Sequence, residues 1–182
     1  YSSFSILQID AHADLRKAYE GFEQSHASIM YNVVESCSNL NQLVQVGIRD
    51  LSADEHKLSL THPKITTFFD WNLKEEGFMG KTWSTQCDEI IESLSNDVYI
   101  SFDIDGLIPN LCPNTGTPVA GGFTLEQLSF LMFKVVDSGR RIIGFDLNEV
   151  SPGSSGDWDA NVGARALWQL VCATELSRRI SC

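Results

Sequence analysis

The stretch VYISFDIDG, residues 98–106, decides how the rest of the chain is interpreted. Its first five residues, Val98–Phe102, are nearly continuous in apolar or small side chains, which is typical of a strand that is covered on both faces of a parallel sheet. Two carboxylates, Asp103 and Asp105, follow where this strand should end. The stretch therefore predicts a buried parallel strand that delivers acidic side chains to its carboxyl end.

Similar apolar runs, alternating with helical patterns, occur on both sides of this strand. Further short apolar runs predict strands near Ile6–Asp10, Leu43–Gly47, Thr66–Phe69 and Arg141–Asp146. Helical patterns fall near Ser28–Ser36, Thr82–Leu94, Thr124–Val136 and Val162–Arg178, whereas residues 54–63 read as a polar stretch in which His56 and His62 are solvated. Short strands that alternate with helices predict an α/β fold, with a parallel sheet between two layers of helices.

Nothing in residues 1–182 marks a domain boundary, so we expect a single α/β domain. The chain opens directly on the predicted strand Ile6–Asp10, without an initiator Met or a basic leader. We therefore expect it to be the C-terminal portion of a fold whose N-terminal part is missing.

The amino-acid composition favours some classes of binding partner, and one cellular compartment, over others. The chain is 43% hydrophobic and 20% charged, as in an ordinary globular protein, and its formal net charge is −11. That charge disfavours nucleic acid and an anionic membrane surface but accommodates cations. The five cysteines are scattered without a C-x-x-C pair, which indicates neither a disulfide framework nor a zinc knuckle and favours a cytoplasmic location.

Ligand-type side chains gather at the ends of the predicted strands. The run DAHAD at residues 10–14 places Asp10, His12 and Asp14 at alternate positions, which share a face in extended geometry. Asp103 and Asp105 repeat this spacing, and Asp146 also falls at a predicted strand end. Carboxylates crowded on one sheet edge would repel one another unless cations held them.

The type of cation can be narrowed. A single D-x-D run at a strand end is more often a turn or a helix cap, and only the two runs together favour a metal site. An EF-hand calcium loop is excluded because Gly106 is the fourth residue of the Asp103 run, whereas that loop needs Gly at the sixth position. A catalytic pair of transition-metal ions remains.

These motifs together resemble a known family. DAHAD at 10–14, SFDIDG at 101–106, GFDLNEVSP at 144–152 and the loop CPNTGTPVAGG at 112–122 closely resemble the signatures of the ureohydrolases, the arginase/agmatinase family. The resemblance extends from Ile9 to about Leu170. It implies the three-layer α/β fold of arginases and deacetylases.

The resemblance also implies a ligand set for two Mn²⁺ ions. Asp10 and Asp103 correspond to the carboxylates that bridge both ions, Asp14 completes the shell of one ion, and His12 and Asp105 complete that of the other. Mixed carboxylate and imidazole ligation suits manganese. Such an ion pair lowers the pKa of a bridging water, which becomes the nucleophile. A further family histidine, in a GGDHS-like motif, is expected upstream of this chain.

Two more residues receive catalytic roles from the resemblance. His26 corresponds to a histidine that passes protons at the rim of the active site, and an imidazole is suited to this near neutral pH. Taken alone, it would be read as a surface or capping histidine. Glu149 corresponds to the glutamate that pairs with the guanidinium of the substrate, for which the alternative is an ordinary carboxylate after a strand.

The resemblance also implies a small cationic guanidino substrate, and we expect agmatine, which would be hydrolysed to putrescine and urea. Arginase, guanidinobutyrase and formimidoylglutamase activities are alternatives, and Arg16 is similar to a residue of some formimidoylglutamases. A deacetylase-like enzyme with a single zinc ion and an inactive, truncated paralogue are further alternatives. The family also implies a homo-oligomer, a trimer or a hexamer.

Overall fold

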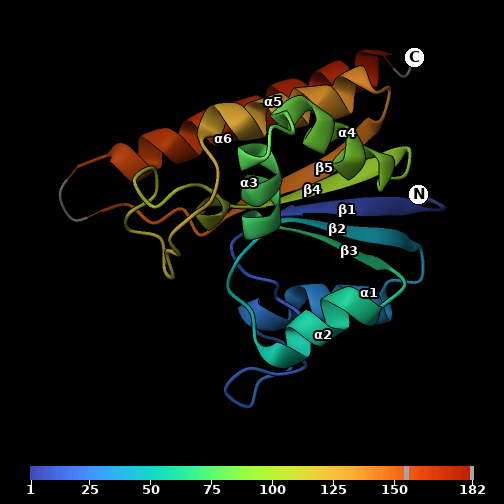
Figure 1. The fold of residues 1–182 in the computed structure, drawn as a ribbon, viewed down its shortest axis with the longest axis vertical. Coiled ribbons are helices and arrows are strands. Elements are labelled where there is room, and N and C mark those ends of the chain that lie inside the picture. The colour runs from blue at the N-terminus through green and yellow to red at the C-terminus, as the bar shows by residue number, and fades with distance from the viewer. Residues whose placement is uncertain (154–155, 181–182) are drawn as a thin grey trace.

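The computed structural model describes residues 1–153 and 156–180. A five-stranded sheet runs through the centre of the molecule (Figure 1), and all its neighbouring strands pair in parallel, in the order β3-β2-β1-β4-β5. The strands are β1 (Phe4–Ile9), β2 (Leu40–Ile48), β3 (Ile65–Phe69), β4 (Asp97–Asp103) and β5 (Arg141–Asn148). Each of these strands lies within three residues of the bounds that the apolar runs predict.

Helices cover both faces of the sheet, as expected for an α/β fold. They are α1 (Ile29–Ser36), α2 (Ala53–Thr61), α3 (Asp70–Phe78), α4 (Trp83–Glu92), α5 (Leu125–Asp137) and α6 (Trp158–Ile180). In Figure 1, α1 and α2 lie on one face of the sheet, and α4, α5 and α6 lie on the other. The sheet therefore has an apolar core on each side, one around Leu43 and Val34 and one around Phe102 and Leu131. The predicted three-layer arrangement is confirmed.

Helices α2 and α3 were not predicted. Residues 54–63 were expected to be a polar stretch, yet most of them form α2, which begins with a capping box between Ser52 and Glu55. This helix carries almost no apolar stripe, and its buried residues are Glu55 and Ser59. His56 is exposed and His62 half-buried just after the helix. Polar residues can form a helix here because the cap satisfies the free amides of its first turn.

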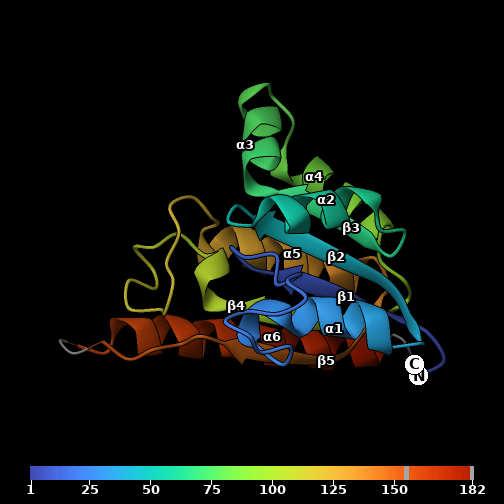
Figure 2. The ribbon, with the colours of Figure 1, turned by 90° about the horizontal axis from the view of Figure 1, so that it is seen from below.

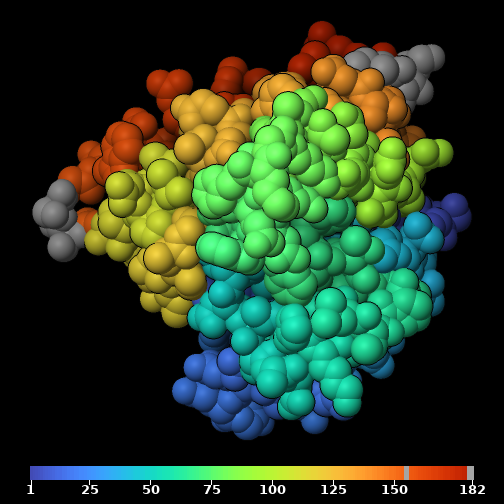
Figure 3. Space-filling view, viewed as in Figure 1, coloured from blue at the N-terminus to red at the C-terminus, as the bar shows by residue number. Residues whose placement is uncertain are grey.

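Helix α3 projects from the body of the molecule (Figure 2) and occupies the middle of the face that is seen in Figure 3. Its large side chains Trp71 and Phe78 are 66% and 80% exposed, while Leu73 packs into the core. A helix that buries so few apolar residues gives no periodic apolar pattern in the sequence.

Strand β5 is longer than predicted. It continues to Asn148, so Asp146 lies within the strand and not at its end. The Asp146 carboxylate accepts hydrogen bonds from Ser101 Oγ at 3.0 Å and from Asn148 Nδ2 at 2.5 Å. Asp146 is therefore part of the sheet, and its carboxylate is hydrogen-bonded to side chains of β4 and β5.

The cysteines of the described residues form no disulfide bonds with one another. Cys37, Cys87, Cys112 and Cys172 are free, and Cys182 lies outside the described residues. Among the helices of the described chain, none is both long and apolar enough to cross a bilayer.

Candidate metal and substrate site

The segment after β1 brings three ligand-type side chains to the carboxyl end of the sheet. Asp10 is buried and accepts a hydrogen bond from the His12 amide at 2.6 Å, which turns the chain directly after the strand. Asp14 adopts a left-handed conformation with φ of 54°. Its carbonyl oxygen accepts hydrogen bonds from the amides of Met30 and Tyr31 in α1. This anchoring offsets the cost of the unusual backbone angle, a feature that tends to cluster at functional sites.

The segment after β4 meets the β1 segment. The Asp103 carboxylate accepts a hydrogen bond from the Asp105 amide at 3.0 Å and thereby caps a short 3-10 turn, Ile104–Gly106. The Asp105 carboxylate accepts one from the Ala11 amide, also at 3.0 Å. Because β1 and β4 are neighbours in the sheet, these bonds fix the two acidic segments side by side.

His12 lies against two of the carboxylates. Its Nδ1 atom is 3.0 Å from Asp105 Oδ2 and 3.5 Å from Asp10 Oδ1. Asp10, His12 and Asp105 each offer one ligand atom, and these atoms all lie within 4.8 Å of one another. Two carboxylates and an imidazole at this spacing form a donor set that suits a divalent transition-metal ion.

The pKa values of the acidic cluster are set first by burial and then by its hydrogen bonds and neighbouring charges. Burial, with the charge of Asp10 next in importance, raises the pKa of Asp14 to about 8 and that of Asp103 to about 9. Burial likewise raises the pKa of Asp10 to about 6, against hydrogen bonds from His12. Hydrogen bonds to Asp10 and Asp105 raise the pKa of His12 to about 10. Asp105 is buried too, but hydrogen bonds from His12 and Ala11 hold its pKa below the usual range. The cluster therefore favours cations, and its Asp10, His12 and Asp105 side chains fit a divalent metal ion.

A buried chain of amide groups lies beneath Asp10. Thr67 Oγ1 donates to Gln45 Oε1, Gln45 Nε2 donates to Gln8 Oε1, and Gln8 Nε2 donates to Asp10 Oδ2, at 2.9, 2.7 and 2.9 Å. Gln8 and Gln45 are fully buried. This network fixes the position of Asp10, and no local sequence pattern predicts it.

Arg49, directly after β2, holds the loop that closes the site. Its guanidinium donates to the carbonyl oxygens of Gly47, Asp105, Leu107 and Val119. Burial lowers its pKa, and the nearby charges of Asp70 and Asp105 act in the opposite direction. The side chain thus connects the end of β2, the Asp105 turn and the loop of residues 109–122, a role that was also not predicted.

Glu149 and His26 approach the acidic cluster from other elements. Glu149, the first residue after β5, has a φ of 60°, and its carbonyl oxygen accepts a hydrogen bond from Thr115 Oγ1 at 3.0 Å. A Cβ atom on Gly116 would lie 3.2 Å from Glu149 Oε2, so the loop passes close to this carboxylate. His26 begins the 3-10 turn before α1, with its ring centroid 5.5 Å from that of Tyr19 in an edge-on arrangement.

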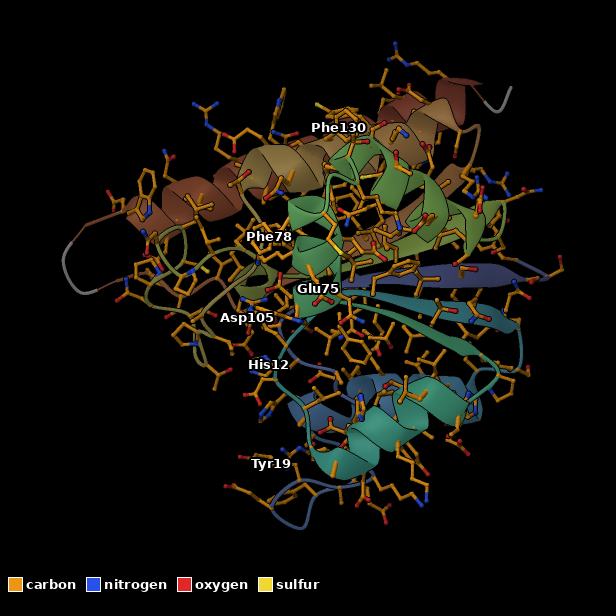
Figure 4. All side chains as sticks on the ribbon, in the orientation of Figure 1. His12, Tyr19, Glu75, Phe78, Asp105 and Phe130 are labelled. Carbon is orange, nitrogen blue, oxygen red and sulfur yellow. The ribbon has the colours of Figure 1, made fainter. Side chains whose placement is uncertain are left out.

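The seven residues to which the resemblance assigns metal-binding or catalytic roles all line one cavity of about 190 Å³. They are Asp10, His12, Asp14, His26, Asp103, Asp105 and Glu149. Figure 4 shows His12 and Asp105 at the end of the strands away from the N-terminus, with Tyr19 on the loop below them. Tyr19, Asp50, Glu55 and Thr117 also line the cavity but were not predicted. A cavity of this size takes a small molecule, because drug-sized ligands occupy pockets of about 300–1,000 Å³.

Comparisons with known proteins identify the family of the chain. A model of the Arginase family matches residues 1–173. N(1)-aminopropylagmatine ureohydrolase from Thermus thermophilus is 36% identical over 164 residues, which cover 90% of this chain and 51% of that protein. Agmatinase from Halalkalibacterium halodurans is 32% identical over 157 residues, which cover 84% of this chain and 48% of that protein.

The crystal structure of agmatine ureohydrolase from Thermoplasma volcanium shares the fold, with a TM-score of 0.78 and 23% identity over 98% of this chain and 57% of that one. The chain spans about half the length of the curated relatives named here. The motifs, the parallel sheet and the match over residues 1–173 lead to one conclusion: the chain belongs to the arginase family.

Proposed function

We propose that this chain carries the greater part of a binuclear manganese site that hydrolyses a guanidino substrate, most specifically agmatine to putrescine and urea. The observation that carries the proposal is the convergence of the seven residues on one cavity at the carboxyl ends of β1, β4 and β5. Open α/β sheets generally bind their ligands at this edge.

The proposed ligands divide into two shells. Asp10 and Asp103 would contact both ions, Asp14 would complete one shell, and His12 and Asp105 would complete the other. The spacing of Asp10, His12 and Asp105 supports the second shell. The raised pKa values of Asp14 and Asp103 support the first, because both carboxylates are buried and lie near the charge of Asp10, so a bound cation would stabilise their charged forms. When bound, the ions would supply the Lewis acidity that makes water a nucleophile near neutral pH.

The chain's own residues would then position the substrate and move its proton. The Glu149 carboxylate would accept hydrogen bonds from the guanidinium and fix its plane beside the metal ligands, and Gly116 leaves space for this contact. Water oxygen bonds to the guanidinium carbon, the bond from this carbon to the alkyl-bearing nitrogen breaks, and that nitrogen gains a proton. His26, at the rim of the cavity, would relay this proton.

The contacts that Arg16 makes within the protein favour agmatine over acidic substrates. The Nε atom of Arg16 lies 3.4 Å from Glu55 Oε2, and its guanidinium stacks over the Tyr19 ring at 5.1 Å. Its charge is therefore compensated within the protein, which weakens the similarity to formimidoylglutamases. Two of the relatives named above are an agmatinase and an aminopropylagmatine ureohydrolase, which supports a substrate with an amine at its far end.

A homo-oligomer, either a trimer or a hexamer, and a cytoplasmic location are part of the same proposal. Helix α6 supports the oligomer because it exposes large apolar side chains at helical spacing, namely Leu167, Trp168, Val171 and Leu176. Sizing of the purified protein by light scattering tests the assembly.

The function is tested with the complete gene product, loaded with Mn²⁺ and assayed against agmatine, arginine, 4-guanidinobutyrate and formiminoglutamate. We expect urea from agmatine at the highest kcat/KM. If the main activity is instead the release of formamide from formiminoglutamate, then formiminoglutamate and not agmatine is the substrate. Release of neither product by the manganese-loaded protein would contradict the proposed activity.

A further inference from the structure

Asp50 stands at the mouth of the cavity with an exposed carboxylate. Its side chain is 64% exposed, and its backbone amide donates to the Ala11 carbonyl oxygen at 3.0 Å. The Asp50 Oδ2 atom lies 3.8 Å from His12 Nε2, which is beyond hydrogen-bonding distance. The main chain is therefore fixed, while within the described residues no donor is hydrogen-bonded to this carboxylate.

The other charges that line the cavity are balanced if the proposed function holds, and the inference rests on that function. Two divalent ions balance the carboxylates of Asp10, Asp14, Asp103 and Asp105. The guanidinium of the substrate balances Glu149, and Arg16 pairs with Glu55. One negative charge, that of Asp50, is left over at the rim.

The Asp50 carboxylate is in a position to contact the end of the substrate that lies away from the reacting guanidinium carbon. The Nδ1 atom of His12 faces Asp10 and Asp105, whereas its Nε2 atom faces Asp50. One imidazole ring thus separates Asp50 from the carboxylates that would hold metal. A guanidino compound whose reacting end lies beside these carboxylates can reach Asp50 with the end of a short alkyl chain.

We propose that Asp50 binds the terminal ammonium group of the substrate and thereby selects guanidino amines over guanidino acids. An ammonium forms a charge-assisted contact with Asp50, an uncharged alkyl end forms none, and a carboxylate is repelled. Asp50 would thus determine substrate specificity, a role separate from those of the metal ligands, His26 and Glu149.

The test compares three substrates that differ only at the far end: agmatine, 1-butylguanidine and 4-guanidinobutyrate. They are assayed with the complete, manganese-loaded protein and its Asp50→Asn variant, and metal content is measured on the same samples. For the variant we expect kcat/KM to fall about tenfold with agmatine, to change less than about twofold with butylguanidine, and to rise with 4-guanidinobutyrate. Metal content should not change. Asp54→Asn is the matched control, because Asp54 is exposed and the substitution removes the same charge at a position outside the cavity.

Two results with an active wild-type protein would overturn the role of Asp50 and leave the proposed function intact. One is an equal loss with all three substrates together with loss of metal, which would mean that Asp50 orients His12. The other is an unchanged ratio of agmatine to butylguanidine activity. If the wild-type protein hydrolyses none of the three, the proposed function itself fails, and the assignment of Asp50 fails with it.

Discussion

The Arg49 guanidinium donates a hydrogen bond of 2.6 Å from Nη2 to the carbonyl oxygen of Asp105. The same nitrogen reaches the carbonyl oxygens of Leu107 and Val119, at 3.2 and 3.0 Å. A single side chain after β2 therefore holds both the turn that presents Asp105 and the loop that passes Glu149.

Replacing Arg49 by Met should lower the free energy of unfolding by about 3 kcal/mol, because several carbonyl oxygens would lose a charged donor in a half-buried place. Chemical denaturation measures this change. Arg179→Met is the control, since Arg179 is 72% exposed and pairs only with Glu175 among the contacts described, and its effect should stay within about 0.5 kcal/mol. Equal effects of the two substitutions would show that Arg49 does not support the loop.

Replacing His26 by Asn should lower kcat on the order of 100-fold and leave the metal content unchanged, since His26 lines the cavity but lies outside the proposed ligand set. Steady-state kinetics and metal analysis on one preparation give both values. His56→Asn serves as the control, because His56 is exposed on α2. Metal loss in His26→Asn as large as in a ligand variant would show that the role of His26 is wrong.

Replacing Glu149 by Gln keeps the size of the side chain but removes the charge that would face the guanidinium. The lost contact is worth roughly 1.5–3 kcal/mol, so kcat/KM should fall by about one to two orders of magnitude. If the contact tightens as the planar carbon becomes tetrahedral, kcat falls as well, whereas an effect on KM alone would indicate uniform binding. Manganese content should be unchanged. A variant with undiminished kcat/KM, equal to that of a Glu126→Gln control on the surface, would refute the assignment.

Manganese should bind more tightly as the pH rises from about 6 to about 9. Asp10, Asp14 and Asp103 have raised pKa values of about 6, 8 and 9, and His12 one of about 10, so the metal-free protein holds protons that the ions must displace. Because these folded-state pKa values are raised, the metal-free protein itself should lose stability as the pH rises through the same range.

Titration calorimetry at several pH values, in buffers of different ionisation enthalpy, measures both the affinity and the protons released. Affinity that does not depend on pH, with no proton release, would mean that the acidic cluster does not receive the ions.

The sequence predicted the strands well because each is a short apolar run, and the match to the parallel α/β fold followed from their alternation with helices. It did not predict α2 and α3, because these helices bury few apolar residues and so show no periodicity. The S-x-x-E run that begins at Ser52 was an available signal for the start of α2.

The candidate site likewise has parts that could be predicted from the sequence and parts that could not. The acidic runs after β1 and β4 could be recognised because their residues are close together in sequence. The supporting contacts could not, because they depend on strand register: Gln8 meets Gln45 only because these two residues are partners in the β1–β2 pairing. Arg49 likewise reaches Val119 across 70 residues of chain, a contact that no local pattern encodes.

The binuclear manganese site is tested most directly by measuring metal content together with urea release from agmatine, in the wild-type complete protein and its Asp103→Asn variant. Asp103 is proposed to contact both ions, and an amide has no charge to offset theirs. We predict close to two manganese ions per chain and urea release for the wild type, and loss of both metal and turnover for the variant. A wild type that holds a single zinc ion, or an Asp103→Asn protein that retains both its manganese and its activity, would rule out the proposed manganese pair.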